Sequence, residues 1–107
     1  MYLIRRTIKT KPGKAWQTAG FLKAVCEAYE KNGRNKATVY IGQGCPGEQD
    51  VAYAEWTQET IEPNWFSNIP EAVGTNAAKM REITEGPHTI EFFEIATAEK
   101  LTERGLV

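Results

Sequence analysis

Residues 51–66, VAYAEWTQETIEPNWF, join two similar halves of this chain. A run with strand-like alternation ends at Trp56, and a polar turn then leads through Pro63 to a second tryptophan, Trp65. The pattern before this stretch is that of a β–α–β unit, and the pattern after it is that of an α–β unit. This order leaves few possible folds, because each strand and helix must bury its apolar side against another element.

The first half begins with the period of a strand and continues with the period of a helix. Residues 2–9 alternate between a more apolar row that holds Ile4 and Ile8 and a row that holds Arg5, which predicts a strand. Residues 12–32 predict a helix, because apolar side chains recur at helical spacing on one broad face. That face consists of Trp16, Ala19, Leu22, Cys26 and Tyr29.

Two further strands follow the predicted helix. Residues 37–43 and 51–57 both alternate with a period of two, which predicts strands. The loop between them, GCPGEQD, lacks the Gly-Lys-Ser/Thr ending of a phosphate-binding loop, so we expect it to be a hairpin connection. Residues 64–68 are expected to form one short helical turn.

The second half contains one more helix and one more strand. A helix is expected to start at residues 69–71 (IPE), and the Gly-Pro pair at 86–87 is expected to end it. Residues 88–95 are the last predicted strand, and residues 97–107 form a polar C-terminal tail that is either a short helix or a frayed end. We therefore expect one α+β domain over residues 1–96, a ferredoxin-like β-α-β-β-α-β antiparallel sheet with two helices on one face.

The face of this sheet that the helices leave uncovered is predicted to carry aromatic residues. Tyr40, Tyr53 and Phe93 fall on it, together with charged residues such as Arg5 and Glu55. An exposed aromatic patch usually marks an interface, and two-fold dimers are the commonest assembly. We therefore expect a homodimer that pairs through this face. The alternative is a half-hydrated antiparallel sheet with scattered apolar residues.

Composition excludes several classes of protein. The net charge is −1 with both signs interspersed, so we expect no nucleic acid and no anionic membrane surface as a partner. No apolar run approaches the ~20 residues that span a bilayer, and the N-terminus lacks the apolar region of a signal peptide. Cys26 and Cys45 make no disulfide framework, and we expect free thiols in a reducing cytoplasm.

Three short stretches resemble members of the dimeric α+β barrel superfamily. They are Lys-Pro-Gly-Lys at 11–14, Ala-Glu-Trp-Thr at 54–57 and Ile-Glu-Phe-Phe-Glu-Ile at 90–95. The first is similar to NIPSNAP-like members, and the second is similar to the tryptophan-containing strand of the antibiotic-biosynthesis-monooxygenase group. The resemblance implies two ferredoxin-like protomers packed sheet against sheet, and a monooxygenase-like or cyclase-like activity without a cofactor. Ala52 stands where monooxygenases of this group often carry an asparagine.

His88 is the one candidate for proton transfer near neutral pH, because it is the only histidine. We expect it at the start of the last strand, overlooking the cleft between helices and sheet, as the catalytic residue if the protein is an enzyme. The alternative is an exposed or hydrogen-bonded loop histidine. No paired spacing of histidines or cysteines suggests a metal site, so none is expected.

The helix–sheet cleft is the candidate ligand site. The residues expected to line it are Trp16, Tyr29, Trp56, Trp65, Asn76 and Met80. Apolar and aromatic walls with a few polar groups suit a flat aromatic or polyketide-like compound. For the tryptophans the alternative is an ordinary core role. Arg5 and Arg6 have the charge to bind an acidic ligand, although a cross-strand pair between Arg5 and Glu55 or Glu91 is the simpler role.

Two functions from different classes follow from these features. The first is a homodimer that binds a flat apolar small molecule in its cleft and acts on it without a cofactor. The second is a non-enzymatic dimer that senses or carries a ligand, or that binds a protein partner. We expect the position of His88 to discriminate between them, since proton transfer requires it to meet a polar partner inside a cavity.

Overall fold

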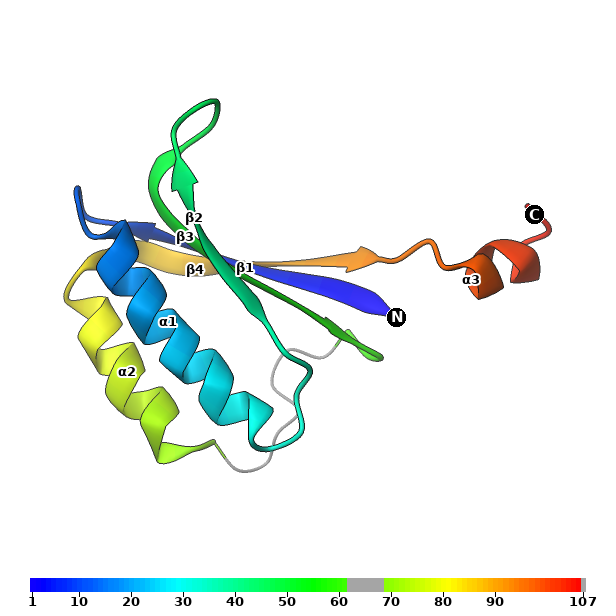
Figure 1. Ribbon diagram of the computed structural model, residues 1–107, viewed down its shortest axis with the longest axis horizontal. Helices are drawn as coiled ribbons and strands as arrows, with labels where there is room; N and C mark the ends of the chain where they lie inside the picture. Colours follow the sequence, from blue (N-terminus) through cyan, green and yellow to red (C-terminus); the bar gives the residue numbers. More distant parts are fainter. Residues whose placement is uncertain (62–68, 107) are drawn as a thin grey trace.

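Seven elements follow one another in the computed structural model, which describes residues 1–61 and 69–106 (Figure 1). In chain order they are β1 (Tyr2–Thr10), α1 (Ala15–Glu30), β2 (Thr38–Gln43), β3 (Gln49–Gln58), α2 (Glu71–Arg81), β4 (Thr84–Glu94) and α3 (Ala98–Glu103). The order through β4 is the predicted one. The short helical turn expected at 64–68 lies outside the described residues.

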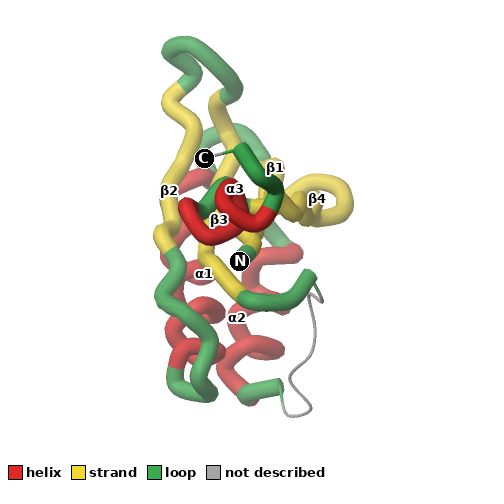
Figure 2. The backbone as a smooth tube through the Cα atoms, turned by 90° about the vertical axis from the view of Figure 1, so that its right-hand side faces the viewer, coloured by secondary structure: helices red, strands yellow, loops and turns green. Residues whose placement is uncertain are grey.

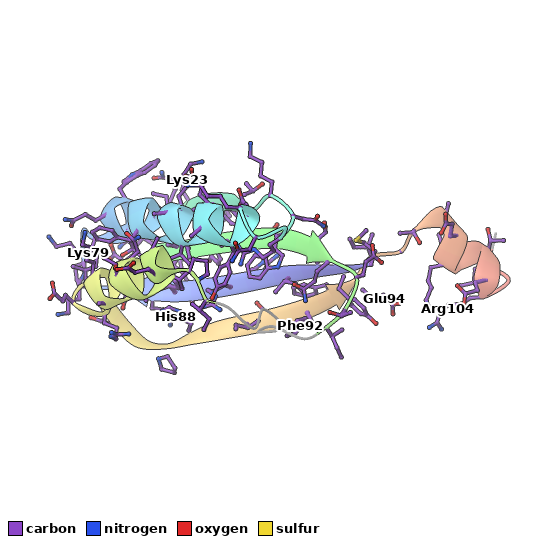
Figure 3. All side chains as sticks on the ribbon, turned by 90° about the horizontal axis from the view of Figure 1, so that it is seen from below. Lys23, Lys79, His88, Phe92, Glu94 and Arg104 are labelled. Carbon is purple, nitrogen blue, oxygen red and sulfur yellow. The ribbon has the colours of Figure 1, made fainter. Side chains whose placement is uncertain are left out.

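The four strands form one antiparallel sheet in the order β2-β3-β1-β4. Figures 1 and 2 show α1 and α2 side by side, and Figure 3 shows both on the same face of this sheet. The predicted ferredoxin-like α+β fold is therefore confirmed, and so is the hairpin between β2 and β3.

The strand register assigns each side chain to a face of the sheet. Ile4 pairs with Trp56 and Ile8 pairs with Ala52, so these residues share the face that the helices cover. Arg5 pairs with Glu55 on the opposite, outer face. The rows deduced from the period-two alternation therefore have the predicted orientation, because neighbouring residues of a strand point to opposite faces.

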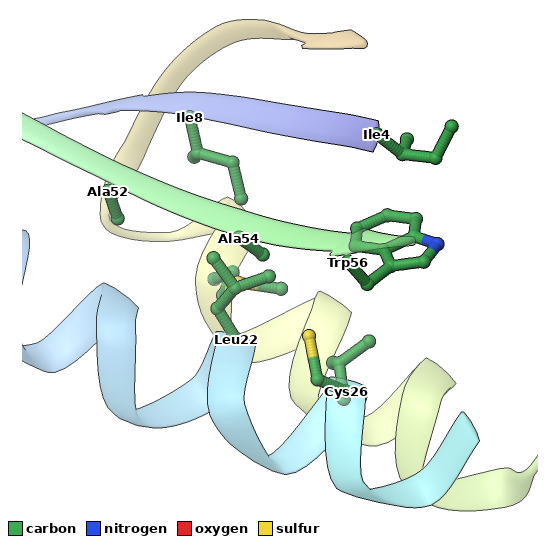
Figure 4. Close-up of a cluster of buried hydrophobic side chains, with 9 residues drawn as sticks. Ile4, Ile8, Leu22, Cys26, Ala52, Ala54 and Trp56 are labelled. Carbon is green, nitrogen blue, oxygen red and sulfur yellow. The ribbon is translucent and has the colours of Figure 1, made fainter. Parts of the chain in front are cut away.

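The core lies between the inner face of the sheet and α1 (Figure 4). Met80 of α2 belongs to the same cluster of buried side chains. Ile4, Ile8 and Leu22 are almost completely buried. Each contributes about 1.5–3 kcal/mol through the apolar surface that it removes from water. Alanines in the middle of β3 leave room for these large side chains. The core thus holds α1 against β1 and β3, and this packing builds the walls of the cleft described below.

Trp16 does not belong to this core, and its predicted core role is wrong for the single chain. The side chain is 73% exposed, whereas its neighbour Ala15 is buried. Successive residues of an α-helix are about 100° apart. Trp16 therefore lies roughly 150° from the middle of a buried face that runs through Thr18, Leu22 and Val25.

The last strand also differs from the prediction, because Gly86 and Pro87 lie inside β4 and do not end α2. Gly86 has a φ of 71°, and the pairing of β1 with β4 shifts register at this point. Proline is tolerated at a bulge on an edge strand because no ladder hydrogen bond is lost there. His88 therefore lies within this irregular part of β4 and does not begin the strand.

The C-terminal tail contains the short helix that was one of its two predicted forms. The hydroxyl of Thr97 caps α3 by accepting a hydrogen bond from the backbone N–H of Lys100 at 3.1 Å. Figure 1 shows α3 beyond the end of the sheet, away from α1 and α2. None of the helices in residues 1–61 and 69–106 is long and apolar enough to cross a bilayer.

Candidate functional site: a cavity between the helices and the sheet

A cavity of about 70 Å³ lies between α1, α2 and the inner face of the sheet. Its described lining residues are Arg6, Leu22, Val25, Cys26, Tyr29, Arg34, Trp56, Val73, Ala77, Met80 and His88. These residues come from β1, α1, β3, α2, β4 and the segment after α1. The site is therefore a product of the whole fold, since no single motif supplies more than a few of its walls.

His88 and Arg6 meet inside this cavity. The Arg6 Nη1 lies 3.1 Å from the His88 Nδ1, and both side chains are half-buried. A guanidinium has donors only, so the His88 Nδ1 is the acceptor and the ring proton resides on Nε2. Burial lowers the pKa of His88, and the Arg6 charge lowers it further. The neutral ring of His88 therefore presents the Nε2–H as a hydrogen-bond donor.

Arg34 covers the aromatic wall of the cavity. Its guanidinium carbon lies 4.1 Å from the centre of the Trp56 ring and 4.9 Å from that of the Tyr29 ring. Such stacking is a favourable cation–π arrangement. The Nε and Nη2 atoms of Arg34 are buried, and they have no hydrogen-bond partner within the described residues. The face of the Arg34 guanidinium is therefore in contact with aromatic rings, whereas the Nε and Nη2 donors on its edge form no hydrogen bond within the described residues.

Trp56 is held in one orientation by its own strand. Its indole Nε1–H donates to the Gln58 Oε1 at 2.9 Å, and the Gln58 Nε2 donates to the Thr60 carbonyl at 2.7 Å. Both side chains are about 95% buried. The ring of Trp56 is thus both a core residue and a cavity wall, so the two predicted roles coincide.

The structure brings together four of the seven predicted site residues. Tyr29, Trp56, Met80 and His88 all line the cavity. Their convergence follows from the two helical faces and two inner strand rows that the sequence pattern had identified. His88 also meets a polar partner inside the cavity, which is the arrangement that we expected of a functional histidine.

The other three predicted site residues lie elsewhere or are not described. Trp16 is exposed and is not a lining residue. Asn76 does not line the cavity either, because its Nδ2 donates to the carbonyl of Ala72 in the preceding turn of α2, at 2.7 Å. The helix face toward the cavity carries Val73 and Ala77 in its place. Trp65 lies outside the described residues.

Arg34 lines the cavity although the sequence did not predict it as a site residue, and Arg6 was predicted only to have the charge to bind an acidic ligand, without a place in the cleft. Arg6 had a visible signal, because it lies between Ile4 and Ile8 in the buried row of β1, where a charged residue is unusual. Its pKa is lowered by burial. Arg34 had no such signal, since it belongs to an irregular segment whose position depends on the packing of α1 against β3.

Cys26 adds little reactivity to the site. The residue is buried, and burial raises the pKa of its thiol, although the nearby Arg34 guanidinium acts in the opposite direction. A neutral buried thiol is a poor nucleophile. Within the described residues no three histidine, cysteine, aspartate or glutamate side chains are placed to hold a metal ion.

The outer face of the sheet carries a second cluster, formed by Arg5, Tyr40, Tyr53, Glu55 and Phe93. The Arg5 Nε donates to the Glu55 Oε1 at 3.0 Å, as predicted for a cross-strand pair. The Tyr40 hydroxyl donates to the same carboxylate oxygen, and the Tyr40 ring stacks on Tyr53 with centroids 4.8 Å apart. The Arg5 guanidinium carbon lies 5.3 Å from the centre of the Phe93 ring.

Comparison with known proteins locates the fold but not a family. No protein-family model and no curated protein sequence matches the chain. The solved structure of an antibiotic biosynthesis monooxygenase aligns with a TM-score of 0.63 and 7% identity, over 91% of this chain and 100% of that one. An uncharacterized NIPSNAP domain protein from Burkholderia xenovorans aligns with a TM-score of 0.55 and 13% identity, over 92% and 97%.

A third solved structure is a dimeric protein of unknown function and ferredoxin-like fold from Bacteroides fragilis. It aligns with a TM-score of 0.57 and 14% identity, over 88% of this chain and 96% of that one. Identities this low show a shared fold and leave function open. The resemblance of fold to monooxygenase-like and NIPSNAP-like proteins that the short stretches indicated is thereby confirmed.

Proposed function

We propose that this protein is a homodimer that binds a flat organic molecule in the cavity between its helices and its sheet. One observation carries the proposal: an aromatic wall and three polar side chains converge on a single cavity. The wall is formed by Trp56 and Tyr29, and the polar groups are Arg6, Arg34 and His88. Apolar and aromatic walls with a few converging polar groups are characteristic of small-molecule sites.

The size of the cavity determines how such a ligand would enter. At about 70 Å³ the cavity is smaller than the roughly 300–1,000 Å³ of a site that encloses a drug-sized compound. Arg34 also lines a second pocket of about 170 Å³ beside the end of β3, with Asn35, Thr57 and Gln58. A ligand would therefore place one end in the cavity and extend past Arg34 toward this second pocket.

The homodimer is the second part of the proposal. The outer face of the sheet holds stacked aromatic rings together with both partners of an ion pair, which suits contact with a copy of itself. One structural neighbour is described as a dimeric protein of ferredoxin-like fold. Packing two such sheets face to face would bury Tyr40, Tyr53 and Phe93.

Within this proposal, binding without turnover is better supported than catalysis. The His88 Nδ1 already accepts a hydrogen bond from Arg6, and Nε2 carries the proton, so the ring has no free lone pair with which to act as a base. The name of a monooxygenase among the structural neighbours favours the other candidate, a cofactor-independent oxygenase or cyclase. In that case His88 and the two arginines would stabilise negative charge that develops on the substrate.

A matched pair of variants tests the site. Ala77 lines the cavity and Ala78, its neighbour on α2, is exposed. We expect Ala77→Phe to fill the cavity and to abolish retention of any ligand that copurifies with the native protein. Ala78→Phe should retain that ligand. Native mass spectrometry of both variants, purified from the host alongside the unmodified chain, measures this directly.

The same measurement can contradict the proposal. Equal ligand retention in the Ala77→Phe and Ala78→Phe proteins would show that the ligand binds elsewhere. If the unmodified chain carries no ligand, a library of planar aromatic compounds should raise its melting temperature, and Ala77→Phe should remove that increase. Failure of every compound to do so would leave the protein-interaction role as the better conclusion.

A further inference from the structure

We propose that the ligand of this cavity is an acid, whose carboxylate binds between the guanidinium groups of Arg6 and Arg34 with the His88 Nε2–H as a third donor. The inference rests on the proposed small-molecule function and specifies the chemistry of its ligand. Three features of the cavity support an acidic ligand: its unbalanced charge, its unused hydrogen-bond donors and its size.

The described lining residues give the cavity a positive charge, and none of them is a carboxylate that could act as a counterion. Both arginines stay protonated at every physiological pH. None of the described lining residues is an aspartate or a glutamate. Glu30, at the end of α1, instead accepts a hydrogen bond from the backbone N–H of Ala37 at 2.9 Å. Partly buried charges without an opposite charge are unfavourable, so two of them facing one cavity indicate a bound anion that balances them.

The unused donors of Arg34 are suited to a carboxylate. Stacking on Trp56 and Tyr29 uses the face of the guanidinium, whereas its N–H bonds lie in the plane of the group. The buried Nε and Nη2 share one edge of the group and have no hydrogen-bond partner within the described residues. Two parallel N–H donors on one edge of a guanidinium match the two oxygens of a carboxylate.

His88 is held in the form that an anion requires. Because the Arg6 Nη1 donates to Nδ1, the Nε2 of the neutral ring carries hydrogen and remains available as a donor. The lowered pKa of His88 favours the same neutral form. A bound carboxylate would offset the charges of Arg6 and Arg34, and it would raise the pKa of His88.

The size of the cavity agrees with a head group. Its volume of about 70 Å³ exceeds the roughly 10–15 Å³ that one water needs, and it accommodates a planar group of a few heavy atoms. The aromatic wall beside it favours a planar body attached to that group. We therefore assign the head group as a carboxylate on an aromatic ring, and a phosphoryl group is the other oxyanion that the experiment must distinguish.

The experiment compares benzoate, its neutral analogue benzamide and inorganic phosphate, by calorimetric titration of the full-length protein. We expect benzoate to bind at least tenfold more tightly than benzamide, the size of one charge-assisted hydrogen bond. Arg6→Met and Arg34→Met should each reduce benzoate affinity at least tenfold. Arg81→Met, at an exposed arginine of α2, should leave it unchanged.

A second measurement excludes trivial loss of folding. His88 is the only histidine, so its ring resonances need no assignment in an NMR titration. Saturating benzoate should raise the pKa of His88 in the unmodified chain. It should not do so in the Arg6→Met protein, whose melting temperature we expect to stay the same or to rise, because an unbalanced charge has been removed.

Each outcome decides the inference. Equal binding of benzoate and benzamide would overturn it and would leave the proposed small-molecule function intact. If none of the three compounds binds, the acid inference fails, and the Ala77→Phe experiment then judges the small-molecule proposal separately. Phosphate that binds as tightly as benzoate would support the oxyanion site and identify a phosphoryl head group as its occupant.

Discussion

Arg5 and Arg6 are adjacent in the sequence and face opposite sides of one sheet, and their surroundings are opposite as well. On the outer face Arg5 pairs with Glu55, and this hydrogen bond raises the pKa of Arg5. On the inner face Arg6 donates to the uncharged ring of His88, no described carboxylate lines the cavity beside it, and burial lowers its pKa. The charge of Arg5 is balanced by Glu55, whereas the charge of Arg6, unbalanced among the described lining residues, is the basis of the proposed acidic ligand.

The same contrast extends to the aromatic residues of the two faces. On the outer face Tyr40 stacks on Tyr53, so ring packs against ring and the carboxylate of Glu55 is shared by its neighbours. On the inner face Trp56 and Tyr29 stack against the cation of Arg34. The outer cluster is complete in itself and suits a flat symmetric contact. The inner cluster retains unused hydrogen-bond donors and suits a small molecule.

The largest expected effect concerns the outer face and its proposed partner. Phe93 and Phe92 are similarly exposed, at 39% and 36%, and lie on opposite faces of β4. We expect Phe93→Lys to weaken the dimer by about 2 kcal/mol or more, roughly a 30-fold change, because it would bury a charge in the interface. Light scattering coupled to size-exclusion chromatography measures this.

The matched control for that experiment is Phe92→Lys, which should remain dimeric. If the two variants behave alike, the assignment of the dimer interface to the outer face is wrong. A Tyr53→Lys variant gives an independent test, since Tyr53 lies in the same outer cluster on β3 and should also yield monomer or unfolded chain.

An intermediate effect concerns the two arginines themselves. Arg5→Met removes one partner of a partly exposed ion pair, so it should lower the free energy of unfolding by about 1 kcal/mol. Arg6→Met removes an unbalanced charge, so it should leave that free energy unchanged or raise it by up to about 1 kcal/mol. Urea denaturation of the two variants, at one protein concentration, compares these changes. Destabilisation by Arg6→Met to the same extent as Arg5→Met would mean that Arg6 is structural.

The smallest expected effects are changes of stability with pH, and the two faces should respond at opposite ends of the scale. His88 faces Arg6 across a cavity that Arg34, Cys26 and Tyr29 also line, and its pKa is lowered. Below about pH 6.5 the unfolded chain therefore binds the proton more readily than the folded chain does, so stability falls as pH falls through the folded pKa. His88→Gln should remove this component from acid denaturation curves.

At alkaline pH we expect the change in stability to come mainly from Tyr40 on the outer face. Burial, followed by the hydrogen bond to Glu55, raises the pKa of Tyr40 to about 12. The folded chain holds this proton more tightly than the unfolded chain, so its contribution is complete below pH ~10 and is lost as pH rises toward 12. Ultraviolet titration should show one of the four tyrosines ionising last, and Tyr40→Phe should remove that step.

Local patterns were sufficient to predict most of the fold. Alternation with a period of two identified the strands and the face that each side chain occupies, because the pleat of a strand leaves no other orientation. The pairing of Arg5 with Glu55 followed from this alternation. Tyr29 and Met80 were also correctly placed in the cleft, since helical spacing determines which side of a helix faces the sheet.

Other features were decided only by tertiary packing. The exposure of Trp16 depends on how α1 rotates against the sheet, and a broad apolar face leaves that rotation open. The place of Gly86 and Pro87 inside β4 depends on β4 being an edge strand, where a bulge tolerates proline. Local sequence patterns predict neither the exposure of Trp16 nor the position of Gly86 and Pro87 inside a strand.

Some features of the candidate site were likewise predictable from the sequence, and others were decided only by packing. The sequence by itself determined that Arg6 and Trp56 share the inner face, because alternation along a strand is a local property. Only the tertiary structure decided that Arg34 lies over Trp56 and that His88 meets Arg6. These contacts join residues far apart in the chain, and their geometry exists only after the helices have packed onto the sheet. The unbalanced charge from which an acidic ligand is inferred is therefore a property of the folded chain.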